Sequence, residues 1–423
     1  MSAATEGSLS GGRIANRNGG EESDGRDTIA LDGISFLLAD VQDNLGAFLT
    51  SLLAAYGWVA SDIGTMIAAG GAGAVTARLA GGWVLDRISS RRALLAACCV
   101  VTAVSITVAA VFPGFWQIAC VHFLAGGAGA LFSPLLAAIS RATAGDDGYM
   151  VRMGRNEAFN HSGNAVIACI MSIAGGVIGP IAPLWAISGL AAASLLLVGL
   201  MTSRADAPDA RHEPSVRGVP AGAQAHHPLA DPRLLIFLAC YLMFNVANGA
   251  TVPLMIERQV AFHFGSSSSM TALCIIVAQA TMVPVAYVVG RSAKRWSRRL
   301  PLLLALALQP LRDLLIMWSA RWPAMCVAEI LDGLSSGVIL VLFYAVLADL
   351  ASGGGRCNLL IGTGLAVGTI GALLSNFCGG LLAARYGFNT AFLALAGSGV
   401  LAFGLFLFAM PETHDVPGRV VRS

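Results

Sequence analysis

Long apolar runs separated by short polar segments dominate this chain of 423 residues. A helix of about 20 apolar residues crosses the roughly 30 Å hydrocarbon core of a bilayer. Runs of that kind occur near residues 29–56, 61–85, 92–112, 115–142, 153–176, 180–202, 233–256, 268–290, 299–319, 322–350, 356–384 and 388–410. The pattern predicts an all-α integral membrane protein with twelve transmembrane helices.

A polar segment rich in Pro, Ala, Asp, Arg and His separates six of these runs from the other six. We therefore expect an N-terminal six-helix half at 28–202, a linker at 203–232, a C-terminal half at 233–410 and a tail at 411–423. Residues 1–27 are rich in Gly, Ser, Arg and Glu and lack the apolar core of a signal peptide. They predict a disordered tail.

Three pairs of segments repeat at a spacing of roughly 200 residues, which predicts two pseudo-symmetric bundles that arose by duplication. The pairs are Gly82 and its basic loop with Gly290 and 291–299, Asp40 and Asp43 with Asn245 and Asn248, and 155–163 with 356–364.

Arginine is distributed unevenly among the polar loops. The loops after 61–85 and 268–290, the loop after 115–142 and the linker are basic, whereas the opposite loops hold only Arg258, Arg321 and Arg385. Because cytoplasmic loops keep positive charge, both termini and the linker are expected to be cytoplasmic. Richness in alanine and scarcity of lysine favour a bacterial chromosome, and so a multi-pass protein of the cell (inner) membrane.

Composition excludes several other classes of function. Hydrophobic residues make up 56% of the chain, charged residues 12%, and the net charge is only +2, which argues against nucleic-acid binding. The nine cysteines lack metal-site spacing, and the chain contains no HExxH, no GxSxG and no phosphate-binding loop. We expect no enzymatic activity, no cofactor and no bound metal.

The segment Gly82-Trp-Val-Leu-Asp86-Arg87-Ile-Ser-Ser-Arg91-Arg92 resembles the signature loop of the major facilitator superfamily, although Ser89 stands where that family usually has glycine. A degenerate second copy at 290–299 and the closing Pro411-Glu412-Thr413 extend the resemblance. The sequences of residues 39–46, 154–164 and 332–333 are similar to those of a bacterial permease group described as generic or efflux-type. The resemblance implies a transporter that works by alternating access.

The signature loop provides candidate gating residues. A carboxylate there can accept hydrogen bonds at a helix end while the arginines hold carbonyls, and such a clasp would latch one half to the other. The alternative is a basic loop that only sets topology. The candidates are Gly82, Asp86, Arg87, Arg91 and Arg92, with Asp349 and Arg356 as the counterpart in the second half.

The span 29–56 carries Asp40, Asp43 and Asn44 on one helical face, at i, i+3 and i+4. A charge within the membrane costs several kcal/mol unless it faces a cavity or a partner. These side chains are candidates for binding a proton or a cationic group. The alternative is a structural ion pair with Arg78 or another buried base.

Two histidines are candidate proton sites, because an imidazole titrates near neutral pH. His122 stands where the resemblance implies an arginine in many proton-coupled exporters; a hydrogen-bonded helix contact is the alternative. His161 can pair with Glu157 at i+4 spacing; for Arg155 and Glu157 the alternative is a polar seam at the cytoplasmic ends of neighbouring helices.

In the second half, Asn245, Asn248, Glu329 and Asp332 are expected near the cavity, where amides can orient a solute. The adjacent charges Arg312 and Asp313 are expected to compensate each other and to be mainly structural.

We therefore expect a monomeric, proton-coupled secondary transporter in the lipid bilayer that moves a small organic solute, with efflux favoured. One alternative is proton-coupled uptake of a small metabolite or siderophore. A membrane sensor or scaffold that has lost transport is the alternative from another class, and the retained protonatable groups in the spans argue against it.

Overall fold

The computed structural model describes residues 25–39, 52–53, 56–58, 60–85, 87–112, 114–179, 181–206, 231–262, 267–293, 295–351 and 357–413. These residues are mostly helical and include no strand. Five sequence candidates lie outside the described residues, namely Asp40, Asp43, Asn44, Asp86 and Arg356. The first described helix already starts at residue 25, so the last residues of the expected tail are helical.

The N-terminal half is built from long helices joined by short loops. They are the helix 25–37, α4 (Ala60–Leu85), α5 (Arg91–Val111), α6 (Phe115–Val177), α7 (Ala182–Leu200) and the short 3-10 helix η1 (Ser203–Asp206). The C-terminal half follows the same plan. Its helices are α8 (Pro232–Asn248), α9 (Thr251–Ala261), α10 (Ser267–Ser292), α11 (Arg299–Trp318), α12 (Trp322–Ala351), α13 (Cys357–Tyr386) and α14 (Phe388–Ala409).

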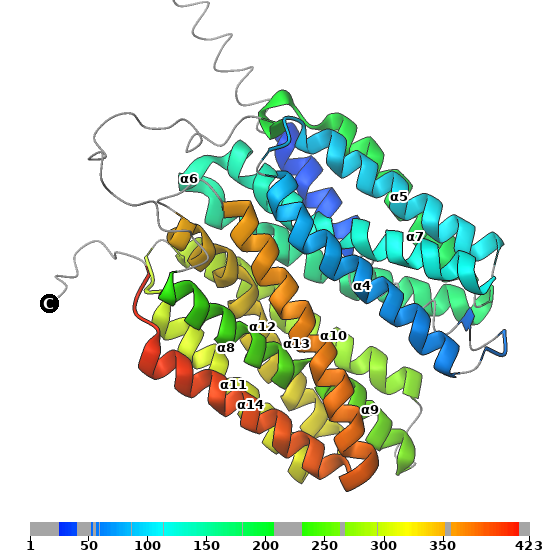
Figure 1. Cartoon of the computed structure of the whole chain (residues 1–423), viewed down its shortest axis with the longest axis vertical. Coiled ribbons are helices and arrows are strands. Elements are labelled where there is room, and N and C mark those ends of the chain that lie inside the picture. The colour runs from blue at the N-terminus through cyan, green and yellow to red at the C-terminus, as the bar shows by residue number, and fades with distance from the viewer. Residues whose placement is uncertain are drawn as a thin grey trace, which may run out of the picture.

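Nine helices among the described residues are long and apolar enough to cross a membrane. The all-α membrane fold expected from the apolar runs is thus confirmed. Each expected span contains a described helical segment, and the two halves lie side by side (Figure 1).

Two spans differ from the predicted boundaries. Residues 143–152 were expected as a loop, but α6 runs on through them with one break at Gly145, whose φ of 65° and ψ of 175° only glycine adopts without strain. The span at 233–256 is instead divided into α8 and α9. The break at Gly249 lies against α13, where a Cβ would come within 2.9 Å of Ala372 Cα.

Each half has its own apolar core. One cluster of buried residues draws only on positions between Ala30 and Ala205, and a second is centred on α8, α11, α12 and α14. The second cluster also includes Tyr149, Met150 and Met153 of α6. The middle of α6 therefore packs against the opposite half.

Glycine pairs bring the halves into close contact near the ends of α4 and α10. A Cβ on Gly82 would lie 2.6 Å from the carbonyl oxygen of Asn358 on α13, and one on Gly362 would lie 3.1 Å from Gly82 Cα. In the matching place, a Cβ on Gly154 of α6 would lie 2.6 Å from Gly290 Cα on α10. Only glycine permits backbones to approach this closely.

The duplication is visible in the packing, but its register differs from the sequence prediction. Gly163 of α6 lies against Phe36 and Ala39, and Gly371 of α13 lies in the same way against Leu242 and Asn245. Gly163 therefore matches Gly371, so the predicted match to Gly364 is wrong. Likewise Ala39, and not Asp40, has the place that Asn245 has in the other half.

Candidate functional site

Polar side chains from both halves meet where α6 passes α10. The imidazole Nδ1 of His161 lies 2.7 Å from Oε1 of Gln279, which stands halfway along α10. The other ring nitrogen, Nε2, lies 4.0 Å from Oε2 of Glu157 and has no hydrogen-bond partner, although it is buried. The pairing of His161 with Glu157 expected from the sequence is thus present as a longer contact.

Arg78 and Tyr241 extend this group across the contact between the halves. Arg78 of α4 donates from Nη1 to the carbonyl oxygen of Leu365 on α13, at 3.3 Å. Tyr241 of α8 lies against the same stretch of α13, where a Cβ on Gly368 would come within 2.7 Å of its ring. We call Arg78, Glu157, His161, Tyr241 and Gln279 the central cluster. Polar groups at this depth of a membrane protein are costly unless they serve each other or a solute.

A second buried polar group, the arginine cluster, lies inside the C-terminal half. The guanidinium of Arg312 is completely buried and lies 3.1 Å from Glu329 Oε1 and 3.0 Å from Asp332 Oδ1. Arg312 also donates to Asn248 Oδ1. Three of the four C-terminal candidates therefore meet around one arginine.

Two side-chain hydroxyls donate further hydrogen bonds to carboxylates beside Arg312. Thr251 Oγ1 donates to Asp313 Oδ1 at 2.9 Å, and Ser336 Oγ donates to Asp332 Oδ1 at 3.1 Å. The ion pairs of Arg312 thus run to α12, and not to the adjacent Asp313 as the sequence suggested. The fourth candidate, Asn245, donates to the carbonyl oxygen of Tyr241 on its own helix at 2.7 Å.

His122 lies in the N-terminal half, away from the central cluster. It is buried against Gly70 of α4, where a Cβ would collide with the imidazole ring. A small cavity beside it is lined by Ser105 and Ile106 of α5. The proton role predicted for His122 stays a prediction.

The arginines of the signature loop hold groups within their own half. Arg92 Nε lies 2.6 Å from Asp206 Oδ2, its backbone N–H donates to Asp206 Oδ1 at 2.9 Å, and its Nη1 donates to Met201 O at 2.8 Å. Burial acts to raise the pKa of Asp206, but the hydrogen bonds from Arg92 and Ser90 outweigh it and hold that pKa below its usual value. This N-terminal clasp fastens α5 to the end of α7.

The C-terminal half repeats this clasp. Glu412 accepts hydrogen bonds from the backbone N–H groups of Arg298 at 3.0 Å and Arg299 at 3.3 Å, and Arg299 Nη2 donates to Leu407 O at 2.6 Å. The spacing of the arginine, the carbonyl and the carboxylate is nearly the same in both halves. The structure thereby supplies a repeat that the sequence analysis missed.

The other gating candidates have separate contacts. Arg87 stacks over Trp83 at 4.0 Å from the ring centroid, and Arg91 donates to the carbonyl oxygen of Ala138 at 3.5 Å. Asp349 pairs with Arg298 at 3.2 Å. Gly82 lies against the backbone of the opposite half at Asn358, and the gating role of this set stays a prediction.

One buried carboxylate was missed by the sequence analysis. Asp32, on the helix 25–37, pairs with both Arg152 and Arg155 of α6, the second at 2.5 Å. The signal was an aspartate within an apolar run opposite a helix that opens with two arginines. Gln279 and Thr251 carried no comparable signal, because single polar residues in apolar helices are common.

Comparison with known proteins gives the same fold. The sequence profile of the Major Facilitator Superfamily matches residues 32–311 and 247–422. An uncharacterised MFS-type transporter of Mycobacterium tuberculosis, present in strains CDC 1551 and H37Rv, is 34% identical over 400 residues, covering 92% of this chain and 94% of the relative.

Solved structures of transporters superpose over nearly the whole chain. The human organic anion transporter MFSD10 has a TM-score of 0.68 at 17% identity, covering 90% of this chain and 99% of that one. The proton:xylose symporter XylE has a TM-score of 0.68 at 13% identity, covering 93% and 97%. The nucleoside transporter NupG has a TM-score of 0.60 at 16% identity, covering 90% and 98%. With its duplicated helical halves and its full-length sequence match, this chain belongs to the major facilitator superfamily of secondary transporters.

Proposed function

We propose that this protein couples proton movement to the transport of a small organic solute by alternating access. The observation that carries the proposal is the hydrogen bond between His161 and Gln279, which joins the two halves beside Glu157. A titratable group at a contact that must break during rocking links proton binding to conformation.

The unpartnered Nε2 of His161 explains how a proton would act. In the neutral ring with Nδ1–H donating to Gln279, Nε2 presents a buried lone pair 4.0 Å from a carboxylate. A proton taken at Nε2 turns this contact into a charge-assisted pair with Glu157. The charge on the imidazolium then favours the state in which Glu157 stays close to it.

The central cluster also supplies groups for a solute. Arg78 offers a positive charge, Tyr241 a phenol group and Gln279 an amide, and they come from both halves. Such a set suits a small organic molecule with polar or anionic groups. Organic anions, nucleosides and pentoses are the solutes named for structurally similar transporters, and they form the first screen. We propose export as the direction of transport, because short segments of the sequence are similar to a permease group described as efflux-type.

The test uses the purified full chain in liposomes with an imposed pH gradient. Fluorescein, uridine and D-xylose serve as the three probes, and flux is measured for the native protein, Glu157→Gln and His161→Gln. The control is Glu257→Gln, which removes an exposed carboxylate on α9. A thermal-shift screen comes first, since a solute at a hundred times its Kd stabilises the protein by about 2.7 kcal/mol.

We expect one probe to flow against its own gradient when a pH gradient is present, and the two cluster variants to lose this coupling while the control keeps it. Flux that is the same with and without the pH gradient would contradict proton coupling. Binding without flux for every probe would favour the sensor alternative.

A further inference from the structure

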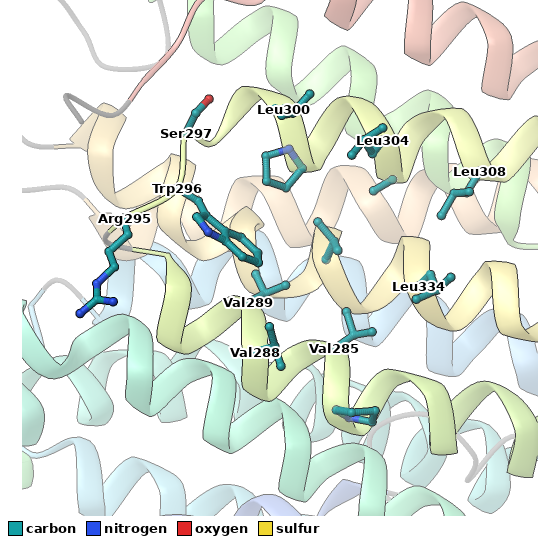
Figure 2. Close-up of a pocket in the computed structure, with 14 residues that line it drawn as sticks. Val285, Val288, Val289, Arg295, Trp296, Ser297, Leu300, Leu304, Leu308 and Leu334 are labelled. Atoms are coloured by element: carbon teal, nitrogen blue, oxygen red, sulfur yellow. The ribbon is translucent and has the colours of Figure 1, made fainter. Parts of the chain in front are cut away.

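The outer face of the C-terminal half has an apolar groove of about 900 Å³ between α10 and α11, with α12 as its floor. Figure 2 shows Val285 and Val288 projecting from α10 toward Leu300 and Leu304 of α11, with Leu334 of α12 between them. We propose that this groove binds one acyl chain of an anionic phospholipid, whose phosphate contacts Arg295.

The lining of the groove fits a hydrocarbon chain. Leu300 is 61% exposed, Leu304 60% and Val288 49%, so these side chains end in the groove and are not packed against other helices. An open apolar surface on a membrane-spanning bundle faces acyl chains, and a groove in that surface holds one of them in place. The groove is separate from the central cluster, so the proposal does not rest on the proposed function.

The length of the groove matches one leaflet. Leu300 and Leu308 are two helical turns apart on α11, which corresponds to about 12 Å along the axis. One leaflet contributes about half of the roughly 30 Å hydrocarbon core. A chain that starts at the loop before α11 would therefore lie along the groove to near the bilayer centre.

The groove ends in a pair of side chains suited to a lipid headgroup. Arg295 and Trp296 lie together at the loop end in Figure 2, and both are exposed. Arg295 has no ion-pair partner within the part of the chain that the structure describes. Tryptophan favours the membrane interface, and an arginine there attracts anionic headgroups.

Neighbouring charges leave Arg295 available. The carboxylate of Glu412 is taken by Ser297 and by the backbone of Arg298, and Asp349 is paired with the side chain of Arg298. Arg291, one turn earlier on α10, stacks over Tyr287 at 4.6 Å. The rim is thus positively charged, which selects an anionic lipid over a zwitterionic one.

The N-terminal half does not repeat these features. The matching clasps place Arg92 and Arg299 in equivalent positions, so Leu300 and Leu304 correspond to Ala93 and Ala97. The matched glycines Gly82 and Gly290 place Arg87 opposite Arg295, and Arg87 stacks over Trp83 on the preceding helix. Of these two matched positions, only the one in the C-terminal half combines large apolar side chains along the groove with a cationic rim.

The experiment measures lipids retained by the full chain in detergent by native mass spectrometry, after equal addition of phosphatidylglycerol and phosphatidylcholine. Variants are Arg295→Gln, which removes the headgroup contact, and Leu304→Trp, which fills the groove. The control is Arg385→Gln, an exposed arginine at the end of α13. Melting temperatures without lipid establish that each variant is folded.

We expect the native protein to retain phosphatidylglycerol preferentially. Arg295→Gln should lower that retention about fivefold, since one basic residue near a membrane surface contributes about 1 kcal/mol. Leu304→Trp should lower retention of both lipids, and Arg385→Gln should change neither. Equal retention of the two lipids, or unchanged phosphatidylglycerol in both groove variants, would overturn the proposal.

Discussion

The two halves share a scaffold but differ in what they bury at the same place. Because Arg92 and Arg299 make equivalent contacts, the sequences of α5 and α11 can be aligned on them. In this alignment Ser105 of the N-terminal half corresponds to Arg312 of the C-terminal half. Gly126 and Gly333 pack in the same way against α4 and α10, which puts His122 in the place of Glu329.

The C-terminal half therefore has an ion-paired cluster where the N-terminal half has a histidine, a serine and a small cavity. A buried charge must be compensated, so Arg312 and its carboxylates depend on one another. His122 can be neutral and needs no counter-ion. The comparison teaches that close helix contacts and end clasps are retained after duplication, whereas buried polar positions diverge.

The largest expected effect comes from removing Arg312. Arg312→Met leaves Glu329 and Asp332 buried without their partner, and it should destabilise the protein by about 3–5 kcal/mol. Ser105→Ala, at the equivalent position, should cost less than about 1 kcal/mol. Thermal unfolding in detergent measures both.

A combined variant sharpens this prediction. Arg312→Met with Glu329→Met, Asp332→Leu and Asp313→Asn removes all four buried charges, and it should recover most of the lost stability, because neutral replacements of buried ion pairs are often tolerated. If the combined variant is no more stable than Arg312→Met alone, the cost does not come from uncompensated charge.

The next effect concerns the contact between the halves. Gly290→Val forces apart the backbones of α10 and α6. The overpacked side chain should destabilise the state in which the halves touch by about 1–3 kcal/mol, and so favour the state in which they are separated. Cys357, buried at the start of α13, should then react with a maleimide about tenfold faster in a chain where it is the sole cysteine. Gly176→Val is the control, because no atom lies within 4 Å of a Cβ there.

The clasps predict a smaller, pH-dependent effect. Asp206→Asn should cost about 1–2 kcal/mol at neutral pH, since the carboxylate accepts charge-assisted hydrogen bonds from Arg92. Because the folded pKa of Asp206 lies below its unfolded value, its contribution is complete above the unfolded pKa of about 3.9 and is lost as the pH falls through the folded value.

The measurement is the difference in unfolding free energy between the native protein and Asp206→Asn from pH 7 down to pH 2. It should stay constant at the upper end and shrink at the lower end. Glu412→Gln provides the comparison in the other half, and it should cost a similar amount at pH 7 because Glu412 caps α11 in the same manner. A difference that grows on acidification would contradict the assignment.

A small effect is also expected at His122. His122→Leu replaces a buried imidazole beside a cavity with an apolar side chain of similar volume, so stability should change by less than about 1.5 kcal/mol. The matched change Glu329→Leu leaves part of the charge of Arg312 uncompensated, and it should lower stability several times more. Equal losses at the two positions would remove the distinction between the halves.

Sequence reasoning recovered the features that depend on one helix at a time. The apolar runs predicted the helices. The polar residues within them singled out His161, Asn248, Glu329 and Asp332, which lie in buried clusters, and their predicted roles in binding a solute or a proton stay predictions. It assigned Arg312 to its neighbour Asp313, whereas the ion pairs of Arg312 are with Glu329 and Asp332 on another helix. It also missed Asp32, whose two arginines lie more than a hundred positions away.

The sequence by itself determined that this chain lies in a membrane as two repeated halves, because the hydrophobic effect acts on segments whose length and composition can be read directly. Only the tertiary structure decided which charges compensate each other, where glycine lets the halves touch, and which face carries a groove. These features depend on distances between segments far apart in the chain, and a shift by one helical position changes which side chain meets its partner.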